Sequence, residues 1–213
     1  LDESVNVARP ADDGKLWLGM RRGLILFDPA TGQSRPLHFG PATGDLSSLQ
    51  VSDVMSGAEG DVWIGTTGSG VARLPPGWRG FRPIIPSLGG DEIKRVTSIT
   101  AGPDGSLWLG SANHGVHRLD PASGVLLPPG IRIENRPNEV VGLHVTEQAV
   151  WSLDRRRLMR DDLETGESRP VIERRSDGED HFEFLVPADD GDLCLGGENA
   201  YMLRLDSSGE VLD

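Results

Sequence analysis

The stretch Asp104-Gly105-Ser106-Leu107-Trp108-Leu109-Gly110 decides the fold, because its second half recurs through the chain. An acidic residue followed by glycine is typical of a tight turn, in which glycine can adopt positive φ. The apolar run after the turn is predicted to be a short strand. Related runs stand at residues 16–19, 62–65, 150–153 and 193–196, and their anchor residues Trp17, Trp63, Trp108, Trp151 and Cys194 are 46, 45, 43 and 43 residues apart.

A period in this range, with short strands and turns inside each copy, is typical of a β-propeller with one four-stranded blade per repeat. The third copy contains strand-like runs at residues 96–101, 107–110 and 116–119, and an outer run begins at Val125. We therefore expect an all-β fold with five recognisable blades in a single propeller domain or fragment. The expected blades cover residues 1–46, 47–91, 92–135, 136–178 and 179–213.

The repeated tryptophan is predicted to fill the gap between neighbouring blades, since an aromatic side chain buries about 150–250 Å². The glycine two residues later would let the backbone of the next blade come close. We expect Trp17, Trp63, Trp108 and Trp151 to be core residues, and Cys194 to be a small buried residue in the same place. Because the chain has one cysteine, an internal disulfide is excluded.

The formal charge of −12 and the pI of about 4.8 argue against a nucleic-acid partner, because binding phosphate backbones requires clustered Lys and Arg. Two lysines accompany 19 arginines among the 21 basic residues, a bias that we attribute to a GC-rich bacterial genome. No apolar run is long enough to span a bilayer, and no leader segment is recognisable. Membrane contact is therefore expected only through segments outside this chain.

The phrases at residues 104–111 and 115–121 resemble the repeat of the two-component regulator propeller family. The resemblance covers all five copies, although the fourth is weak and the fifth has lost its tryptophan. It implies a non-catalytic sensor domain in the periplasm, in front of a membrane span and a cytoplasmic histidine kinase or diguanylate cyclase. A small molecule or oligosaccharide would be its ligand, and the full-length receptor could self-associate as a dimer.

Propellers of that family usually have seven blades, whereas five copies fill this chain. The sequence is compatible with a closed five-bladed ring or with a piece of a seven-bladed one. We favour the piece, since the chain stops soon after the third strand of the fifth copy and unpaired sheet edges need partners. The run Gly89-Gly90-Asp91-Glu92-Ile93 is nearly the diguanylate cyclase signature, but without surrounding helical periodicity it is expected to be an acidic loop between blades.

In propellers, the loops between second and third strands share one face with the connections between blades, and that face is the usual ligand site. Its residues here are polar with both charge signs, which suits a hydroxyl-rich ligand or a protein partner, although exposed loops are polar in any case. No catalytic residue, metal ligand or cofactor motif is recognised. The candidate ligand-binding residues are Arg21, Arg22, Ser69, Asn113, His114, Arg155, Glu198 and Asn199.

Two other functions remain open. The first is an enzyme of the streptogramin-lyase type, a family whose propeller repeat has Trp-Phe-Thr after an Asp-Gly turn. Its chemistry uses a histidine and a metal at the channel mouth, and His114 would then be the base. The Trp-Leu-Gly of this chain differs from the Trp-Phe-Thr of that repeat, which disfavours an enzyme. The second is a protein-interaction scaffold of the WD type, but the Gly-His and Trp-Asp pairs of that repeat are missing from this sequence.

Overall fold

The computed structural model describes residues 4–11, 14–37, 49–57, 59–76, 82–88, 91–129, 139–174, 181–188, 191–197 and 202–212. The chain divides into two compact units, Leu1–Ile99 and Thr100–Asp213, with the boundary inside the first strand of the third blade. Within the described ranges, no helix has the length and apolar character needed to cross a membrane.

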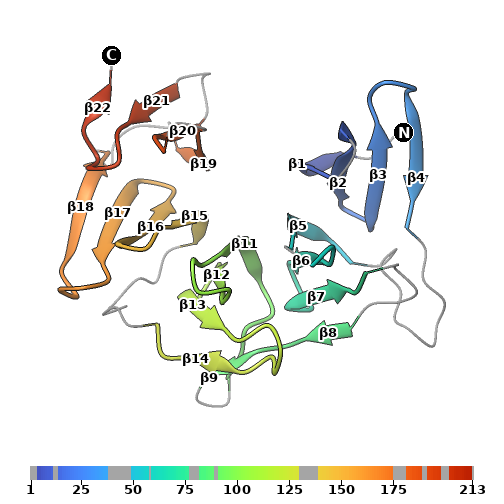
Figure 1. Ribbon diagram of the computed structural model, residues 1–213, viewed down its shortest axis with the longest axis horizontal. Coiled ribbons are helices and arrows are strands. Elements are labelled where there is room, and N and C mark those ends of the chain that lie inside the picture. The colour runs from blue at the N-terminus through green and yellow to red at the C-terminus, as the bar shows by residue number, and fades with distance from the viewer. Residues whose placement is uncertain are drawn as a thin grey trace. The chain divides into compact units, whose positions relative to one another are not determined.

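Five four-stranded antiparallel sheets follow one another along the chain, and strands adjacent in sequence are adjacent in each sheet (Figure 1). This arrangement confirms the five expected blades. Blade 1 contains β1 (Val5–Pro10), β2 (Leu16–Met20), β3 (Leu24–Asp28) and β4 (Gln33–Pro36), and blade 2 contains β5 (Val51–Ser56), β6 (Val62–Thr66), β7 (Val71–Leu74) and β8 (Arg82–Ile84). Blade 3 contains β11 (Val96–Ala101), β12 (Leu107–Ser111), β13 (Gly115–Leu119) and β14 (Leu126–Leu127). Blade 4 contains β15 (Val140–Val145), β16 (Ala149–Asp154), β17 (Arg157–Asp162) and β18 (Ser168–Glu173), and blade 5 contains β19 (Phe182–Pro187), β20 (Leu193–Gly197), β21 (Met202–Leu205) and β22 (Val211–Leu212).

The connection between blades 2 and 3 is more ordered than the sequence indicated. The expectation of a plain loop over residues 89–93 is wrong in part, because β9 (Ser87–Leu88) and β10 (Asp91–Glu92) pair as a small hairpin. Ile93 is fully buried, and its backbone N–H donates to the Pro86 carbonyl at 2.8 Å. An apolar side chain thus anchors this acidic hairpin to the core.

The repeated tryptophan packs between successive blades inside each unit. All four tryptophans of the repeat are only 2% exposed. Each of three packs against the blade that follows: Trp17 against Val51 and Val54, Trp108 against Val140 and Leu143, and Trp151 against Phe182 and Leu185.

The glycine after the tryptophan also packs closely, but against a side chain. A Cβ added at Gly19 would lie 2.5 Å from Val51 Cγ1 of the next blade and 2.6 Å from Val7 Cγ1. At Gly65 the nearest atom would be Val96 Cγ1, at 3.1 Å. The expected approach of a neighbouring backbone is therefore corrected to an approach of valine side chains on the first strand of the next blade.

Blade 5 has the four strands expected of each blade, the last of them the short β22. It differs from the prediction at its anchor residue. Cys194 is half-buried, whereas the tryptophans at the same place are buried. In this unit no described blade follows blade 5, so the face that carries Cys194 lacks the cover that the tryptophans receive.

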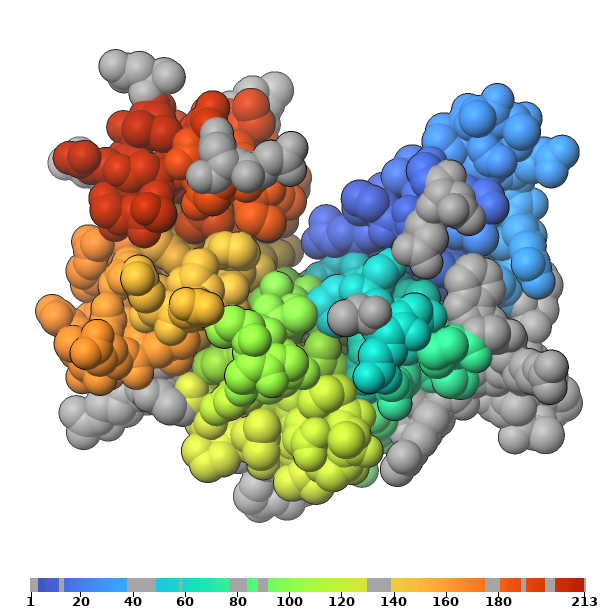
Figure 2. All heavy atoms as spheres, in the orientation of Figure 1, coloured from blue at the N-terminus to red at the C-terminus, as the bar shows by residue number. Residues whose placement is uncertain are grey.

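Burial is greatest in the second strand of each blade and low in the fourth strands. In blade 4, the side chains of β16 are buried except at Asp154, whereas β18 is mostly exposed. Figure 2 shows the orange residues of β18 and the red residues of β22 at the surface of their unit. The second strand is thus the most buried strand of its blade, and the loop that follows it begins at a well-packed element.

Candidate functional site

The loop between β16 and β17 presents two arginines on a tight turn. The Asp154 Oδ1 atom accepts hydrogen bonds from the backbone N–H groups of Arg156 and Arg157, both at 2.7 Å. The other carboxylate oxygen of Asp154 lies 3.4 Å from Arg157 Nε. A side chain that binds the backbone two and three residues further on is a common way to fix such a turn, so the backbone that carries Arg155 and Arg156 has a defined conformation.

Arg155 is fixed from two further directions. Its Nε donates to Glu139 Oε2 at 2.9 Å, and Glu139 stands directly before the first strand of the same blade. Its carbonyl accepts the Phe182 N–H of blade 5 at 2.9 Å. Blade 1 has a related bond at this edge, from Gly23 N–H to the Leu49 carbonyl at 2.9 Å.

A cavity of about 360 Å³ opens at this edge of blades 4 and 5. Arg155 pairs with Glu139, and Asp154 pairs with Arg157. Arg156 is exposed, and its guanidinium forms no ion pair within the described part of the chain. With Arg157 included, the described residues of this region carry three arginines and two carboxylates, in a protein whose formal charge is −12. The cavity is lined by Glu139, Asp154, Arg155, Arg156 and His181.

The other predicted residues lie on corresponding loops of other blades. Arg21 and Arg22 are exposed after β2, in the unit that ends at Ile99. The backbone N–H of Ser69 donates to Thr66 Oγ1 at 2.9 Å, and that of His114 donates to Ser111 Oγ at 2.9 Å. These loops share one design, since each hydroxyl also donates to a glycine carbonyl further along. Asn113 is exposed, and Glu198 and Asn199 lie outside the described residues.

Of the predicted residues, the structure places Arg155 in the cavity. The other lining residues were not among the candidates; they are Glu139, Asp154, Arg156 and His181. A signal for His181 was present. It directly precedes Phe182, the first residue of β19, just as Glu139 directly precedes Val140, the first residue of β15. Both residues therefore end connections between blades, which belong to the same edge as the loops between second and third strands.

The pair His114 and His117 is a separate feature of blade 3. Their ring centroids are 6.4 Å apart. His117 is 7% exposed, and its Nε2 atom has no hydrogen-bond partner in the described structure. Burial, helped by the neighbouring His114, lowers the pKa of His117 from 6.5 to about 4. Within the described residues, no group of three histidine, cysteine or carboxylate side chains could hold a metal ion.

Solved structures with this fold include lyases and extracellular domains of two-component systems. Virginiamycin B lyase from Staphylococcus aureus is 16% identical, with a TM-score of 0.71 over 96% of this chain and 67% of the lyase. The extracellular domain of a putative hybrid two component system from B. thetaiotaomicron is 15% identical, with a TM-score of 0.70 over 98% of this chain and 28% of that chain. A putative one component system from the same organism gives a TM-score of 0.61 at 16% identity, over 99% of this chain and 33% of that one.

Neither a family model nor a curated protein matches the sequence. At identities this low, the solved structures show the fold alone, and a propeller supports many unrelated functions. The chain spans about a third or less of the two extracellular domains and about two thirds of the lyase. Function must therefore be argued from the residues of the site.

Proposed function

We propose that the protein is a non-catalytic, ligand-binding input domain of a bacterial transmembrane signalling protein, and that the cavity beside Arg156 receives an acidic group of its ligand. The observation that supports this proposal most directly is the pre-fixed loop from Asp154 to Arg157, with one guanidinium left without an ion pair. Arginine pairs with carboxylates through two parallel hydrogen bonds. A rigid loop also lowers the entropy cost of binding.

The sensor assignment is supported by the repeat at residues 104–121 and by the extracellular domains that share the fold. We further propose that the five blades belong to a larger propeller of seven blades, located outside the cytoplasm. The family whose repeat the sequence resembles usually has seven blades, and this chain spans 67% of the lyase and a third or less of the two extracellular domains. Reading the gene outward on both sides tests this arrangement. Two more repeats, a membrane span and a kinase or cyclase domain are expected, and a frame that lacks them would contradict the signalling role.

The binding proposal can be tested with two sugars of one ring size. D-Glucuronate carries a carboxylate and D-glucose does not. We expect glucuronate to bind saturably, as monitored by the NMR signals of the His181 imidazole. The sugar should be recovered unchanged. Arg156→Gln should weaken this binding about tenfold, because a charge-assisted hydrogen bond contributes about 1.5–3 kcal/mol.

Arg35→Gln is the matched control, since it removes the same charge from an exposed arginine on β4. An equal loss of affinity in both variants would mean that only the general charge matters. Absence of glucuronate binding would reject the cavity as a carboxylate site, and conversion of the sugar would reject the non-catalytic assignment.

A lyase-like enzyme is the second candidate, because a streptogramin-type lyase shares the fold and His114 lies beside His117. Incubation with virginiamycin B, the antibiotic in the name of the similar lyase, distinguishes the two functions. Under the sensor proposal the antibiotic stays intact. Its loss, abolished by His114→Ala, would favour the enzyme.

A further inference from the structure

A second cavity lies at the opposite ends of the same strands. Strand β16 begins at Ala149 and ends at Asp154. Asp154 lines the cavity described above, whereas Ala149 lines another cavity of about 300 Å³. This second cavity is also formed by blades 4 and 5, since Gly191, Leu193 and Ser207 of blade 5 contribute to it. It is therefore separate from the cavity beside Arg156.

The interior of the second cavity is built from one row of side chains across blade 4. His144 on β15 is directly opposite Trp151 on β16, which is directly opposite Arg160 on β17. Residues opposite one another in a sheet project from the same face. All three line the cavity, and the Arg160 guanidinium lies 5.7 Å from the centre of the Trp151 ring.

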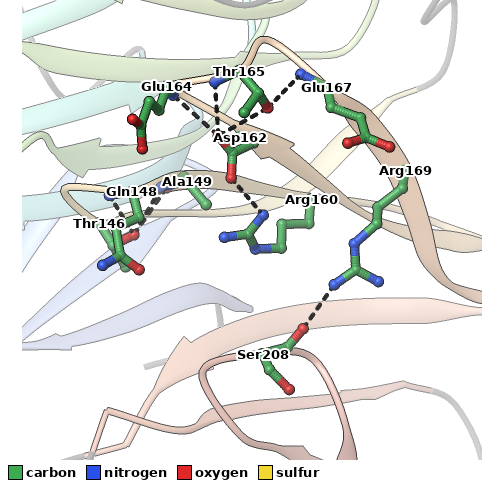
Figure 3. Close-up of polar contacts among 10 residues, drawn as sticks. All are labelled: Thr146, Gln148, Ala149, Arg160, Asp162, Glu164, Thr165, Glu167, Arg169 and Ser208. Carbon is green, nitrogen blue, oxygen red and sulfur yellow. Dashed lines mark hydrogen bonds and ion pairs between the residues drawn. The ribbon is translucent and has the colours of Figure 1, made fainter.

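Arg160 is held in a defined position but keeps donors available. Its Nη1 atom donates to Asp162 Oδ2 at 3.1 Å. Asp162 is fixed in turn by the N–H groups of Thr165 and Glu164, at 2.9 and 3.1 Å. Figure 3 shows the guanidinium below Asp162 and beside the turn that carries Gln148. Within the described residues no other acceptor engages Arg160, so its remaining N–H groups can serve a ligand.

His144 supplies a second polar group without a partner. It is half-buried and forms no hydrogen bond within the described part of the chain. Burial lowers the pKa of His144 below its ordinary 6.5, so the imidazole is neutral near pH 7 and offers one donor and one acceptor. In the corresponding rows the first strand carries Arg9 in blade 1, Met55 in blade 2 and Val186 in blade 5, so none of these three rows has an imidazole.

The far side of the cavity is closed by blade 5. Arg169 Nη2 donates to the Ser208 carbonyl at 2.9 Å, joining β18 to the turn between β21 and β22 (Figure 3). At Gly209, in the same turn, an added Cβ would lie 3.2 Å from Trp151 Cη2. The indole is thus packed from both blades, and the cavity is a built feature and not a gap between loosely placed sheets.

The charge of this cavity favours an uncharged ligand. The cation of Arg160 is compensated by Asp162, and His144 is neutral. Glu147, at the rim, has no ion pair within the described residues. The described lining is thus left with one uncompensated negative charge, at the exposed rim, which disfavours an anion, and a cation in the interior would lie against the Arg160 guanidinium. Hydroxyl groups avoid both costs because each can donate and accept, and the lining offers donors at Arg160 and acceptors at Glu147, with both at Gln148 and Ser207.

We propose that this cavity is a second binding site, for a neutral polyhydroxylated molecule about the size of one sugar ring. Its volume is at the lower end of small-molecule sites, which span about 300–1,000 Å³. The site does not depend on the signalling role or on the cavity beside Arg156. The two sites differ in the charge of the ligand that they favour, which is negative beside Arg156 and zero in the second cavity.

The same pair of sugars tests the proposal. D-Glucose should shift the NMR signals of the His144 imidazole and the Trp151 indole, with a Kd of about 1–10 mM as expected for so small a ligand. D-Glucuronate should shift these signals more weakly, although it is expected to shift those of His181. Arg160→Met should weaken glucose binding at least about fivefold, and His144→Met, which copies blade 2, should weaken it as well.

Arg118→Met is the matched control. Arg118 also stacks on a repeat tryptophan, at 5.8 Å from the Trp108 ring centre, and also pairs with an aspartate, Asp104. Its loss should leave glucose binding unchanged. The proposal is overturned if glucose shifts neither signal, if glucuronate binds there more tightly than glucose, or if the Arg118 and Arg160 variants weaken binding equally.

Discussion

Arg9 and Asp53 form an ion pair between blades 1 and 2, with Arg9 Nη2 at 3.0 Å from Asp53 Oδ1. Asp53 is 2% exposed and lies on β5. Its Oδ2 atom also accepts the Ile99 N–H of β11 at 2.8 Å. One carboxylate therefore joins the first strands of three successive blades in the unit that ends at Ile99.

Removal of this carboxylate should loosen that unit. Asp53→Ala leaves the Ile99 N–H without its acceptor, which should lower the free energy of unfolding by about 2–4 kcal/mol. Asp53→Asn keeps an oxygen acceptor and should cost less. Urea unfolding of the two variants measures the difference, and equal losses would mean that only the charge of Asp53 matters.

The decrease in the free energy of unfolding caused by Asp53→Asn should also depend on pH. Burial raises the pKa of Asp53 above 3.8, although the Arg9 charge opposes this shift. Because the folded pKa is raised, the stability that the protonated carboxyl contributes is present at low pH and is lost as the pH rises through the folded pKa. The variant should thus be most destabilised relative to the parent near pH 4, and less so at pH 7. A difference that is constant, or that grows with pH, would contradict this assignment.

His117 should make blade 3 sensitive to acid. Its pKa is lowered to about 4 in the fold, so the stability associated with the neutral ring is present above pH 6.5 and is lost as the pH falls toward 4. The shift corresponds to about 3 kcal/mol. His117→Met should remove this loss of stability at low pH. A methionine, Met159, already occupies the position on β17 of blade 4 that corresponds to His117 on β13 of blade 3. Urea midpoints at pH 7 and pH 4.5 should differ less in the variant than in the parent.

Most of the fold could be predicted from the sequence because the residues of the repeat recur wherever one blade packs against the next. Trp17, Trp108 and Trp151 recur where each blade must fill the gap to the next one, and Asp-Gly turns recur between strands. The hairpin of β9 and β10 was missed because two-residue strands carry no periodicity. The exposure of Cys194 was missed because it depends on which sheet covers blade 5.

The site was less predictable, since the loops vary while the repeat constrains the strands. Arg155 was selected because it lies between second and third strands, but nothing in the sequence indicated its pair with Glu139. The row of His144, Trp151 and Arg160 comes from three strands, and only the register brings these residues to one face. Trp151 was predicted to be a core residue, so no feature of the sequence indicated that a cavity lies beside it.

Gly209 should be more sensitive to substitution than glycines in open turns. Its φ is +95°, and an added Cβ would lie 2.8 Å from Val171 Cγ1. Gly166, in the same unit, has φ +72° and no atom within 4 Å of an added Cβ. Gly209→Ala should therefore cost about 1–3 kcal/mol more than Gly166→Ala. Thermal unfolding of both variants tests this expectation, and equal losses would indicate that the turn between β21 and β22 simply shifts.

Asp154 should position the ligand-binding loop while its charge opposes an acidic ligand, and two substitutions separate these effects. Asp154→Ala removes the acceptor for the Arg156 and Arg157 N–H groups. The loop then loses its fixed conformation, so glucuronate should bind about tenfold more weakly. Asp154→Asn retains an oxygen that can accept the same hydrogen bonds but removes a negative charge beside the carboxylate. Glucuronate should bind this variant as tightly as the parent or more tightly, as measured by calorimetry at low ionic strength. Tighter binding by both variants would mean that the loop holds its shape without Asp154 and that charge alone controls affinity.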